Sequence, residues 1–394
     1  MRKTILLIIA LSFILAGCKN APSGQYTYQH PEQLNDGLEA GSLDEVHIDP
    51  TLIDNAVNSI REGQNKEVHA MLLYKDGKLV LEEYFTGHDY QWDAPNHHGP
   101  LVGWDRTKLH CLHSVTKSFT ATCIGLAIEE GFIDSVRQSI FDYLPEHQHL
   151  KTDGKDKITI EHLLTMTSGL EWDEWSTPYS STDNDNVGIW FQDKDPITYI
   201  LEKPLVAEPG TSFAYSGGNM DLLGEIIRQA SGMPIDAFAS RYLFQPLGID
   251  TAHWDLRFEN GVIETGGSLK LRPRDMAKEG VLFLNKGVWN GKRILSEEWA
   301  EKSATPFAGN QGIDIPNEDS GRVGYGYAWW TKPYTLTGQR INMYYAGGWG
   351  GQHIMVLPQA NTVVVFTGGN YMTYRPPFRI MQEYILPAIV NEHT

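Results

Sequence analysis

Strand-like runs gather near the two ends of this chain, and the segment between them is mainly helical in pattern. The runs are residues 68–73 and 78–85 near the start and 341–346, 353–357 and 362–367 near the end. The first two flank Lys75-Asp76-Gly77, which is typical of a hairpin turn. One antiparallel sheet built from both chain ends and flanked by helices satisfies this order. We therefore predict an α+β fold with an inserted, mainly helical lobe.

The periodicity of the remaining segments indicates how the domain is organised. We expect a single bilobed domain over residues 41–390, with an α/β lobe at about 41–130 and 265–390 and a helical lobe at about 131–264. Residues 380–390 indicate a terminal helix broken by Pro387, and residues 171–195 indicate a long loop at a cleft. The other expected helices are residues 160–165, 219–231, 234–242 and 274–285.

The first residues resemble a bacterial lipoprotein signal. Arg2 and Lys3 precede a mainly apolar core of eleven residues, 5–15, and a lipobox ends at Cys18. Eleven residues are too few to span a bilayer, for which about 20 are needed. We expect residues 1–17 to be a removed signal peptide, Cys18 to carry lipid, and residues 18–40 to be a tether. This predicts a lipid-anchored protein on the periplasmic side of the cell envelope, in the outer membrane where the host has one. An ordinary secretory signal cut nearby is the alternative.

The charge balance limits the partners of the chain. Without Arg2 and Lys3 of the signal, 30 basic residues face 49 acidic ones. Such an acidic surface does not favour nucleic acid or an anionic membrane as a partner. We therefore expect a small-molecule substrate, and membrane contact through the N-terminal lipid only. The sequence leaves the oligomeric state open.

The segment Ser114-Val115-Thr116-Lys117 places a hydroxyl and an amine three residues apart at a predicted helix start. Residues at this spacing share a helix face, with Cβ atoms about 5–6 Å apart. Ser114 Oγ and Lys117 Nζ can therefore touch. A serine becomes a nucleophile when a neighbouring base takes its proton, and the S-x-x-K arrangement supplies one. The alternative is a capping serine followed by a solvated lysine.

A second candidate is Tyr215, in Pro209-Gly210-Thr211-Ser212-Phe213-Ala214-Tyr215-Ser216, just before a predicted helix. A tyrosine hydroxyl with a pKa near 10 is a poor base until cations favour its phenolate. Beside Lys117, Tyr215 could accept the Ser114 proton and return it to a leaving group. The alternative is a packed tyrosine followed by a small-residue turn.

The third candidate segment surrounds Trp349 with four glycines, directly after a predicted strand. Glycines let backbone N–H groups approach a ligand closely. We expect Gly347, Gly348 and Trp349 to form one wall of an oxyanion hole. The amide of Ser114, at its helix N-terminus, is the other expected donor. The alternative is a glycine-rich turn with a packed tryptophan.

The order S-x-x-K, P-G-x-x-F-x-Y-S and a glycine-rich strand end resembles the serine β-lactamase and penicillin-recognising superfamily. More narrowly, it is similar to the class C β-lactamase-related group, which includes esterases, D-aminopeptidases and the 6-aminohexanoate-dimer hydrolase. The resemblance implies a β-lactamase/DD-peptidase-like fold from about Ala70 onward. Further similar stretches are residues 160–170, 242–249, 266–269 and 274–277.

The resemblance also implies roles for the candidate residues. Ser114 would be the nucleophile, Lys117 the base that shares its proton, and Tyr215 the acid and base for the leaving group. The amides of Ser114 and Trp349 would bind the oxyanion, and no cofactor is implied. Whether Lys117 or Tyr215 is the acylation base stays open, because the two are expected to titrate as a coupled unit.

Two departures from the family pattern bear on the substrate. Class C β-lactamases have Y-x-N where this chain has Tyr215-Ser216-Gly217, and a Lys or His where it has Ala346. The missing cation would recognise the substrate carboxylate, so β-lactam hydrolysis is disfavoured. The pattern resembles the esterase and aminohexanoate-dimer hydrolase side of the group. The alternatives are a D-Ala peptidase or weak β-lactamase acting on peptidoglycan-like substrates, and a non-catalytic binding or regulatory homologue.

Cysteine and histidine spacing indicates neither disulfides nor metals. We expect Cys111 and Cys123 to be free, buried thiols. His110 and His113 fit packing better than zinc, and His97-His98 has no matching second pair of ligands. The sequence from Asp183 begins like a calcium loop but has Lys194 where the bidentate Glu belongs. We therefore predict no metal site. Three tryptophans are candidates for lining the cleft: Trp172, Trp175 and Trp190.

Overall fold

The computed structural model of the protein describes residues 26–316, 318, 320–336, 338–372 and 376–390. Its main sheet has nine strands: β1 (Glu39–Ala40), β2 (Val68–Lys75), β3 (Lys78–Tyr84), β11 (Ile313–Asp314), β12 (Arg322–Tyr325), β13 (Trp330–Leu336), β14 (Gln339–Gly348), β15 (Gln352–Leu357) and β16 (Thr362–Gly368). Their order is β1-β3-β2-β16-β15-β14-β13-β12-β11. Strands from the two chain ends meet where β2 pairs antiparallel with β16. All pairs are antiparallel except β1 with β3, so the predicted α+β sheet is confirmed.

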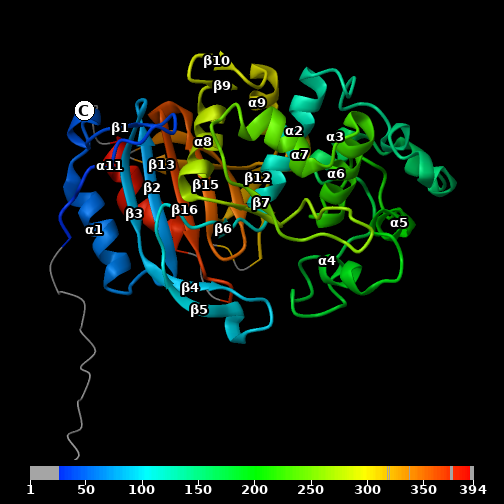
Figure 1. Cartoon of the computed structure of the whole chain (residues 1–394), viewed down its shortest axis with the longest axis horizontal. Helices are drawn as coiled ribbons and strands as arrows, with labels where there is room; N and C mark the ends of the chain where they lie inside the picture. Colours follow the sequence, from blue (N-terminus) through cyan, green and yellow to red (C-terminus); the bar gives the residue numbers. More distant parts are fainter. Residues whose placement is uncertain (1–25, 317, 319, 337, 373–375, 391–394) are drawn as a thin grey trace, which may run out of the picture.

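Helices cover the sheet and form a separate layer beside it (Figure 1). Within that layer α6 is central, because α2, α3, α5 and α7 all contact it. The helices are α1 (Pro50–Arg61), α2 (Val115–Glu129), α3 (Ile160–Leu164), α4 (Asp185–Gly188), α5 (Pro196–Glu202), α6 (Gly217–Ser231), α7 (Ile235–Ala239), α8 (Pro273–Leu284), α9 (Glu297–Ser303), α10 (Pro377–Ile380) and α11 (Leu386–Val390).

Both faces of the central strands are covered, which explains why β2, β15 and β16 are buried along their whole length. On one face, α8 lies so close that a β-carbon on Gly280 would be 2.8 Å from Ile354 Cγ2. On the other face, the ring of Phe378 in α10 lies 5.0 Å from that of His353. Because neighbouring residues of a strand point to opposite faces, His353 and Ile354 mark the two covered sides.

Smaller strands connect the sheet to the helical layer. A three-stranded sheet orders β6 (His110–Cys111), β8 (Leu269–Leu271) and β7 (His253–Trp254), and it leads directly into α2. The hairpin of β4 (Thr86–Tyr90) and β5 (His98–Gly103) follows β3. A further pair consists of β9 (Val288–Trp289) and β10 (Lys292–Arg293).

The segment predicted to be a tether differs from that prediction over residues 26–40. Tyr26 is buried and its hydroxyl donates to Glu83 Oε1 at 2.7 Å, while the Tyr28 hydroxyl donates to Val80 O at 2.8 Å. Strand β1 then extends the sheet by pairing with β3. Aromatic anchors and backbone pairing therefore hold this segment on the domain. Cys18 and the predicted signal lie outside the described residues.

Other local differences follow from backbone chemistry. Pro387 is the second residue of α11, which continues without a gap from α10 and a π-helical turn over Met381–Ile385, so the expected break at Pro387 is not seen. The missing proline N–H removes one helical bond, and the wider turn lies directly before it. A similar turn, Ser240–Phe244, follows α7.

Both Cys111 and Cys123 are free thiols, but Cys111 is only partly buried. In the described ranges, no helix combines the length and apolar character needed to cross a membrane.

Candidate active site

Ser114 occupies the N-terminal cap of α2, where the end of β14 encloses it. A β-carbon on Gly348 would lie 2.3 Å from Leu112 O and 3.2 Å from Val115 N, so only glycine fits there without a shift. The sequence suggested that Gly347 and Gly348 follow the strand. They are instead the last two residues of β14. The glycine-rich strand end therefore lies directly against the turn that carries Ser114.

Lys117 is the nearest charged partner of Ser114. Its Nζ donates to Ser114 Oγ at 3.2 Å and to Gly266 O at 2.9 Å, and lies 3.9 Å from Glu174 Oε1. Only 2% of Lys117 is exposed. The i, i+3 spacing on α2 thus directs a buried amine at the serine hydroxyl, as the sequence pattern predicts.

Tyr215 lies beside the same amine. Lys117 Nζ is 4.8 Å from the centroid of the Tyr215 ring, which stacks on Trp175 at 5.1 Å and on Trp330 at 5.7 Å. The next residue, Ser216, caps α6 by accepting a hydrogen bond from Asn219 N at 3.1 Å. Helix capping on one side and aromatic stacking on the other therefore fix Tyr215 near Lys117.

Ser114 opens onto two cavities that share Glu174, Tyr179 and Trp349 in their walls. Their volumes are about 410 Å³ and 330 Å³, enough for a small organic substrate with groups on both sides of the serine. The first is also lined by Trp175, Tyr215, Ile315, Trp330, Gly347 and Gly348. The second is also lined by Tyr90, Trp92, Val187, Trp190, Phe191 and Leu256.

Two backbone N–H groups at the junction of these cavities are available to a ligand. Among the residues that the structure describes, no acceptor takes a hydrogen bond from the amide of Ser114 or of Trp349. The indole of Trp349 is held separately, since its Nε1 donates to Tyr371 O at 2.8 Å. Unpaired amides at a helix start and a glycine-rich strand end are the donors that an oxyanion hole requires.

Glu174 is a site residue that the sequence did not reveal. Its Oε2 accepts hydrogen bonds from Gly217 N at 2.6 Å and Trp172 Nε1 at 3.0 Å, and its Oε1 accepts one from the Tyr179 hydroxyl at 2.9 Å. These bonds hold a buried carboxylate towards Lys117 and both cavities. The only sequence signal was its place in the loop assigned to the cleft.

A second acidic group lies on the other side of Lys117. Glu264 accepts hydrogen bonds from Gly266 N at 2.8 Å and Gly267 N at 2.9 Å, and Gly266 is also the residue that binds Lys117. Burial raises the pKa of Glu264, and burial together with the charge of Glu264 raises the pKa of Asp221 well above its usual range. Burial therefore disfavours the charged forms of Glu264 and Asp221, and the charge of Lys117 opposes that effect.

The remaining candidates separate into cavity-lining and structural residues. Trp175 lines the first cavity and Trp190 the second, but Trp172 is buried against α6 and contacts Gly218. Asn184, in the segment resembling a calcium loop, caps α4 by accepting from Asn186 N at 3.0 Å. That segment serves as a helix start.

Comparisons with known proteins agree with this geometry. The sequence profile described as Beta-lactamase matches residues 53–372. The 6-aminohexanoate-dimer hydrolase of Paenarthrobacter ureafaciens is 27% identical over 295 residues, which cover 73% of this chain and 69% of that protein. Esterase EstB of Burkholderia gladioli is 30% identical over 146 residues, covering 35% of this chain and only 36% of the esterase.

A solved structure shares the fold of this chain. The structure of the octameric penicillin-binding protein homologue from Pyrococcus abyssi superposes with a TM-score of 0.62 at 21% identity. The superposition covers 86% of this chain and 77% of the other, and at that identity it speaks for the fold alone. The family profile spans most of the chain, including all three candidate segments. The chain therefore belongs to the beta-lactamase family of serine hydrolases.

Proposed function

We propose that this protein is a cofactor-free hydrolase that cleaves an ester or a small amide through an acyl-enzyme on Ser114. The observation that carries the proposal is the 3.2 Å contact between Lys117 Nζ and Ser114 Oγ at the mouth of the cavities. Tyr215, next to the same amine, completes an acid–base pair with Lys117. The amides of Ser114 and Trp349 supply the oxyanion donors.

The reaction has two steps. Ser114 Oγ attacks the substrate carbonyl carbon, and its proton passes to the Lys117–Tyr215 pair. The carbonyl oxygen gains negative charge that the two amides stabilise. The bond from the carbonyl carbon to the leaving oxygen or nitrogen then breaks, and the leaving group takes that proton. Water attacks the acyl-enzyme, releasing the acid and restoring the Ser114 hydroxyl.

The charge of the first cavity supports a substrate without a carboxylate. Its wall contains Glu174 and Glu318 but, among the described residues, neither lysine nor arginine. A carboxylate such as that of a β-lactam or a D-Ala terminus would meet like charge there, which costs affinity. Neutral or cationic esters and amides fit better. This supports the esterase side of the group, because a 6-aminohexanoate dimer itself ends in a carboxylate.

The test compares Ser114→Ala with Ser180→Ala, which alters an exposed serine lining the same cavity. We expect Ser114→Ala to lose at least about 1,000-fold in the hydrolysis of p-nitrophenyl butyrate and all labelling by a fluorophosphonate probe. Ser180→Ala should keep both. Full activity of Ser114→Ala would refute the proposal. An unreactive wild type would favour a non-catalytic homologue, and acylation by a chromogenic cephalosporin would favour a peptidase or weak β-lactamase.

We further propose that the protein is a lipoprotein of the cell envelope, anchored through Cys18 and facing the periplasm. The support is the lipobox and the short apolar segment before it. Labelling with radioactive palmitate should mark the wild type and Cys111→Ser but not Cys18→Ser. Equal labelling of Cys18→Ser would exclude this anchor.

A further inference from the structure

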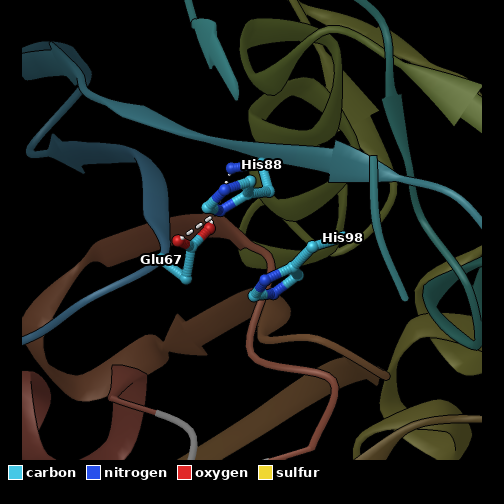
Figure 2. Close-up of side chains that lie close together, drawn as sticks. All are labelled: Glu67, His88 and His98. Atoms are coloured by element: carbon cyan, nitrogen blue, oxygen red, sulfur yellow. Dashed lines mark hydrogen bonds and ion pairs between the residues drawn. The ribbon is translucent and has the colours of Figure 1, made fainter. Parts of the chain in front are cut away.

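Three side chains able to bind a metal ion converge where the β4–β5 hairpin meets the main sheet (Figure 2). None of the three lines either cavity. Glu67 immediately precedes β2, His88 lies in β4, and His98 is the first residue of β5. Their ligand atoms all lie within 4.8 Å of one another. In the sequence, no other ligands lie at a recognisable spacing from His97-His98. The fold brings the partners of His98 from the loop before β2 and from β4, the strand that pairs with β5.

We propose that Glu67, His88 and His98 bind one Zn²⁺ ion, with water completing its coordination. Two imidazole nitrogens and one carboxylate oxygen form a ligand set that suits zinc, at distances of about 2.0–2.2 Å. Calcium and magnesium prefer all-oxygen sites, so they are not the expected ions. A shift of roughly 1 Å or less in each side chain would bring these atoms to a common centre, since tetrahedral ligands at such distances lie about 3.3 Å apart.

The surrounding hydrogen bonds orient the ligands, as hydrogen bonds to the metal-binding side chains do in zinc proteins. His98 Nε2 donates to Gly369 O at 2.8 Å, which leaves Nδ1 with its lone pair for a metal. Glu67 Oε2 accepts from His69 Nε2 at 3.2 Å and from the His88 amide at 2.9 Å. One carboxylate oxygen is thus anchored to the protein, while the other faces His88 Nδ1 at 2.8 Å.

The backbone around the cluster is tightly packed, which limits how far the ligands can spread. A β-carbon on Gly87 would lie 2.3 Å from His69 Cδ2, and one on Gly369 would lie 3.0 Å from Glu67 Oε2. The rings of His88 and His98 are parallel, with centroids 4.5 Å apart. The ligands are therefore held near one another before any ion binds.

A bound ion would connect this cluster to the active-site wall. His97, the neighbour of His98, packs edge-to-face on Trp349 with ring centroids 4.8 Å apart, and it lines the first cavity. Zinc bridging β4, β5 and the start of β2 would therefore hold that wall in place. The ion is assigned a structural role, independent of the proposed hydrolysis.

The experiment titrates ZnCl₂ into the metal-free, full-length protein in competition with a chromophoric chelator. We expect one tightly bound ion per chain. His88→Ala and His98→Ala should each weaken binding more than about 100-fold, because losing even an outer-shell partner of a ligand costs about 10–100-fold. His253→Ala, which alters an exposed histidine outside the cluster, should bind as the wild type does.

Two further measurements keep the outcome clear. Circular dichroism of the metal-free variants should match the wild type, because His88 and His98 are partly exposed. Co²⁺ in place of zinc should give the visible absorption of a four-coordinate N/O site in the wild type and His253→Ala only. Failure of the wild type to bind zinc, or binding unchanged in both His88→Ala and His98→Ala, would overturn the assignment.

Discussion

Gly348 lies so close to Leu112 that a β-carbon at position 348 would be 2.3 Å from the Leu112 carbonyl oxygen. This contact joins the end of β14 to the turn that leads into α2. It therefore sets where the Trp349 amide stands relative to Ser114. The two halves of the proposed oxyanion hole come from segments more than two hundred residues apart, and one glycine allows them to meet.

Replacing Gly348 with alanine should therefore damage catalysis more than folding. The new methyl group must push β14 away from Leu112, and a displacement of about 1 Å in a catalytic group can cost about 100-fold in rate. We expect kcat for p-nitrophenyl butyrate to fall by about 10- to 100-fold. Gly103→Ala is the matched control, because a β-carbon there meets nothing within 4 Å. A wild-type kcat in Gly348→Ala would contradict the assigned geometry.

Glu279 should make the protein less stable as the pH rises. It is fully buried in α8; its Oε2 has no partner among the described residues, and the single hydroxyl proton of Thr122 is shared between Ser118 O and Glu279 Oε1. Burial raises its pKa from 4.5 to about 8, although the Thr122 hydrogen bond opposes the shift. The folded state thus binds this proton more tightly than the unfolded state. The contribution of Glu279 to the free energy of unfolding has its full value below about pH 4.5 and is lost as the pH rises to about 8.

Glu279→Gln should remove that pH dependence. Glutamine keeps an oxygen that accepts from the Thr122 hydroxyl but cannot ionise. We expect the variant to be more stable than the wild type at pH 8.5 by on the order of a few kcal/mol, and of similar stability at pH 4.5. Urea unfolding monitored by circular dichroism at both pH values measures the difference. If the free energy of unfolding changed equally with pH in the two proteins, Glu279 would not be the group responsible.

Trp175 should affect substrate turnover through Tyr215. The two rings stack at 5.1 Å, and aromatic pairs are worth about 0.5–1.5 kcal/mol beyond their buried area. Trp175→Ala should therefore lower kcat/KM by about 2- to 10-fold, while Trp175→Phe should recover most of the loss. Steady-state kinetics on p-nitrophenyl butyrate, with melting temperatures as the stability control, will distinguish positioning from folding. Equal losses in both variants would argue against stacking as the cause.

The charge of the first cavity predicts a substrate preference. We expect kcat/KM for p-nitrophenyl butyrate to exceed that for the p-nitrophenyl hemiester of glutaric acid by at least about 10-fold. The acyl chains are similar, but the second carries a carboxylate that faces Glu174 and Glu318. The difference in kcat/KM should change little with salt, because the side chains of Glu174 and Glu318 are buried and salt screens buried charges only weakly. A preference for the anionic ester would contradict the proposed substrate class.

The chain-end strands and the contact between Ser114 and Lys117 could be predicted because both depend on local spacing. Short apolar runs on either side of a turn at Asp76-Gly77, with φ of 49° and 91°, specify the first hairpin. The i, i+3 spacing of Ser114 and Lys117 on one helix fixes the contact between them. In each case the partners are neighbours in the sequence, so tertiary packing adds little to the prediction.

Glu174, Glu264 and the Glu67 cluster could not be predicted, because their partners are distant in sequence. A hydrogen bond from Gly217 N, 43 residues away, positions the Glu174 carboxylate. The His98 ring is positioned by its hydrogen bond to Gly369 O, 271 residues away. The tether prediction failed over residues 26–40 for a related reason. The polar composition suggested a linker, but Tyr26 and Tyr28 are anchored by β3.

The pairing of β2 with β16 has a consequence for biogenesis. A chain still being synthesised exposes the edge of β2 for nearly three hundred residues before its partner exists, and such distant pairings make folding slow. Any fragment that stops before β14 would have the nucleophile but lack the strand end that completes its oxyanion pocket. A chain that is cut short before β14 is therefore expected to lack the proposed hydrolysis, even where α2 has formed.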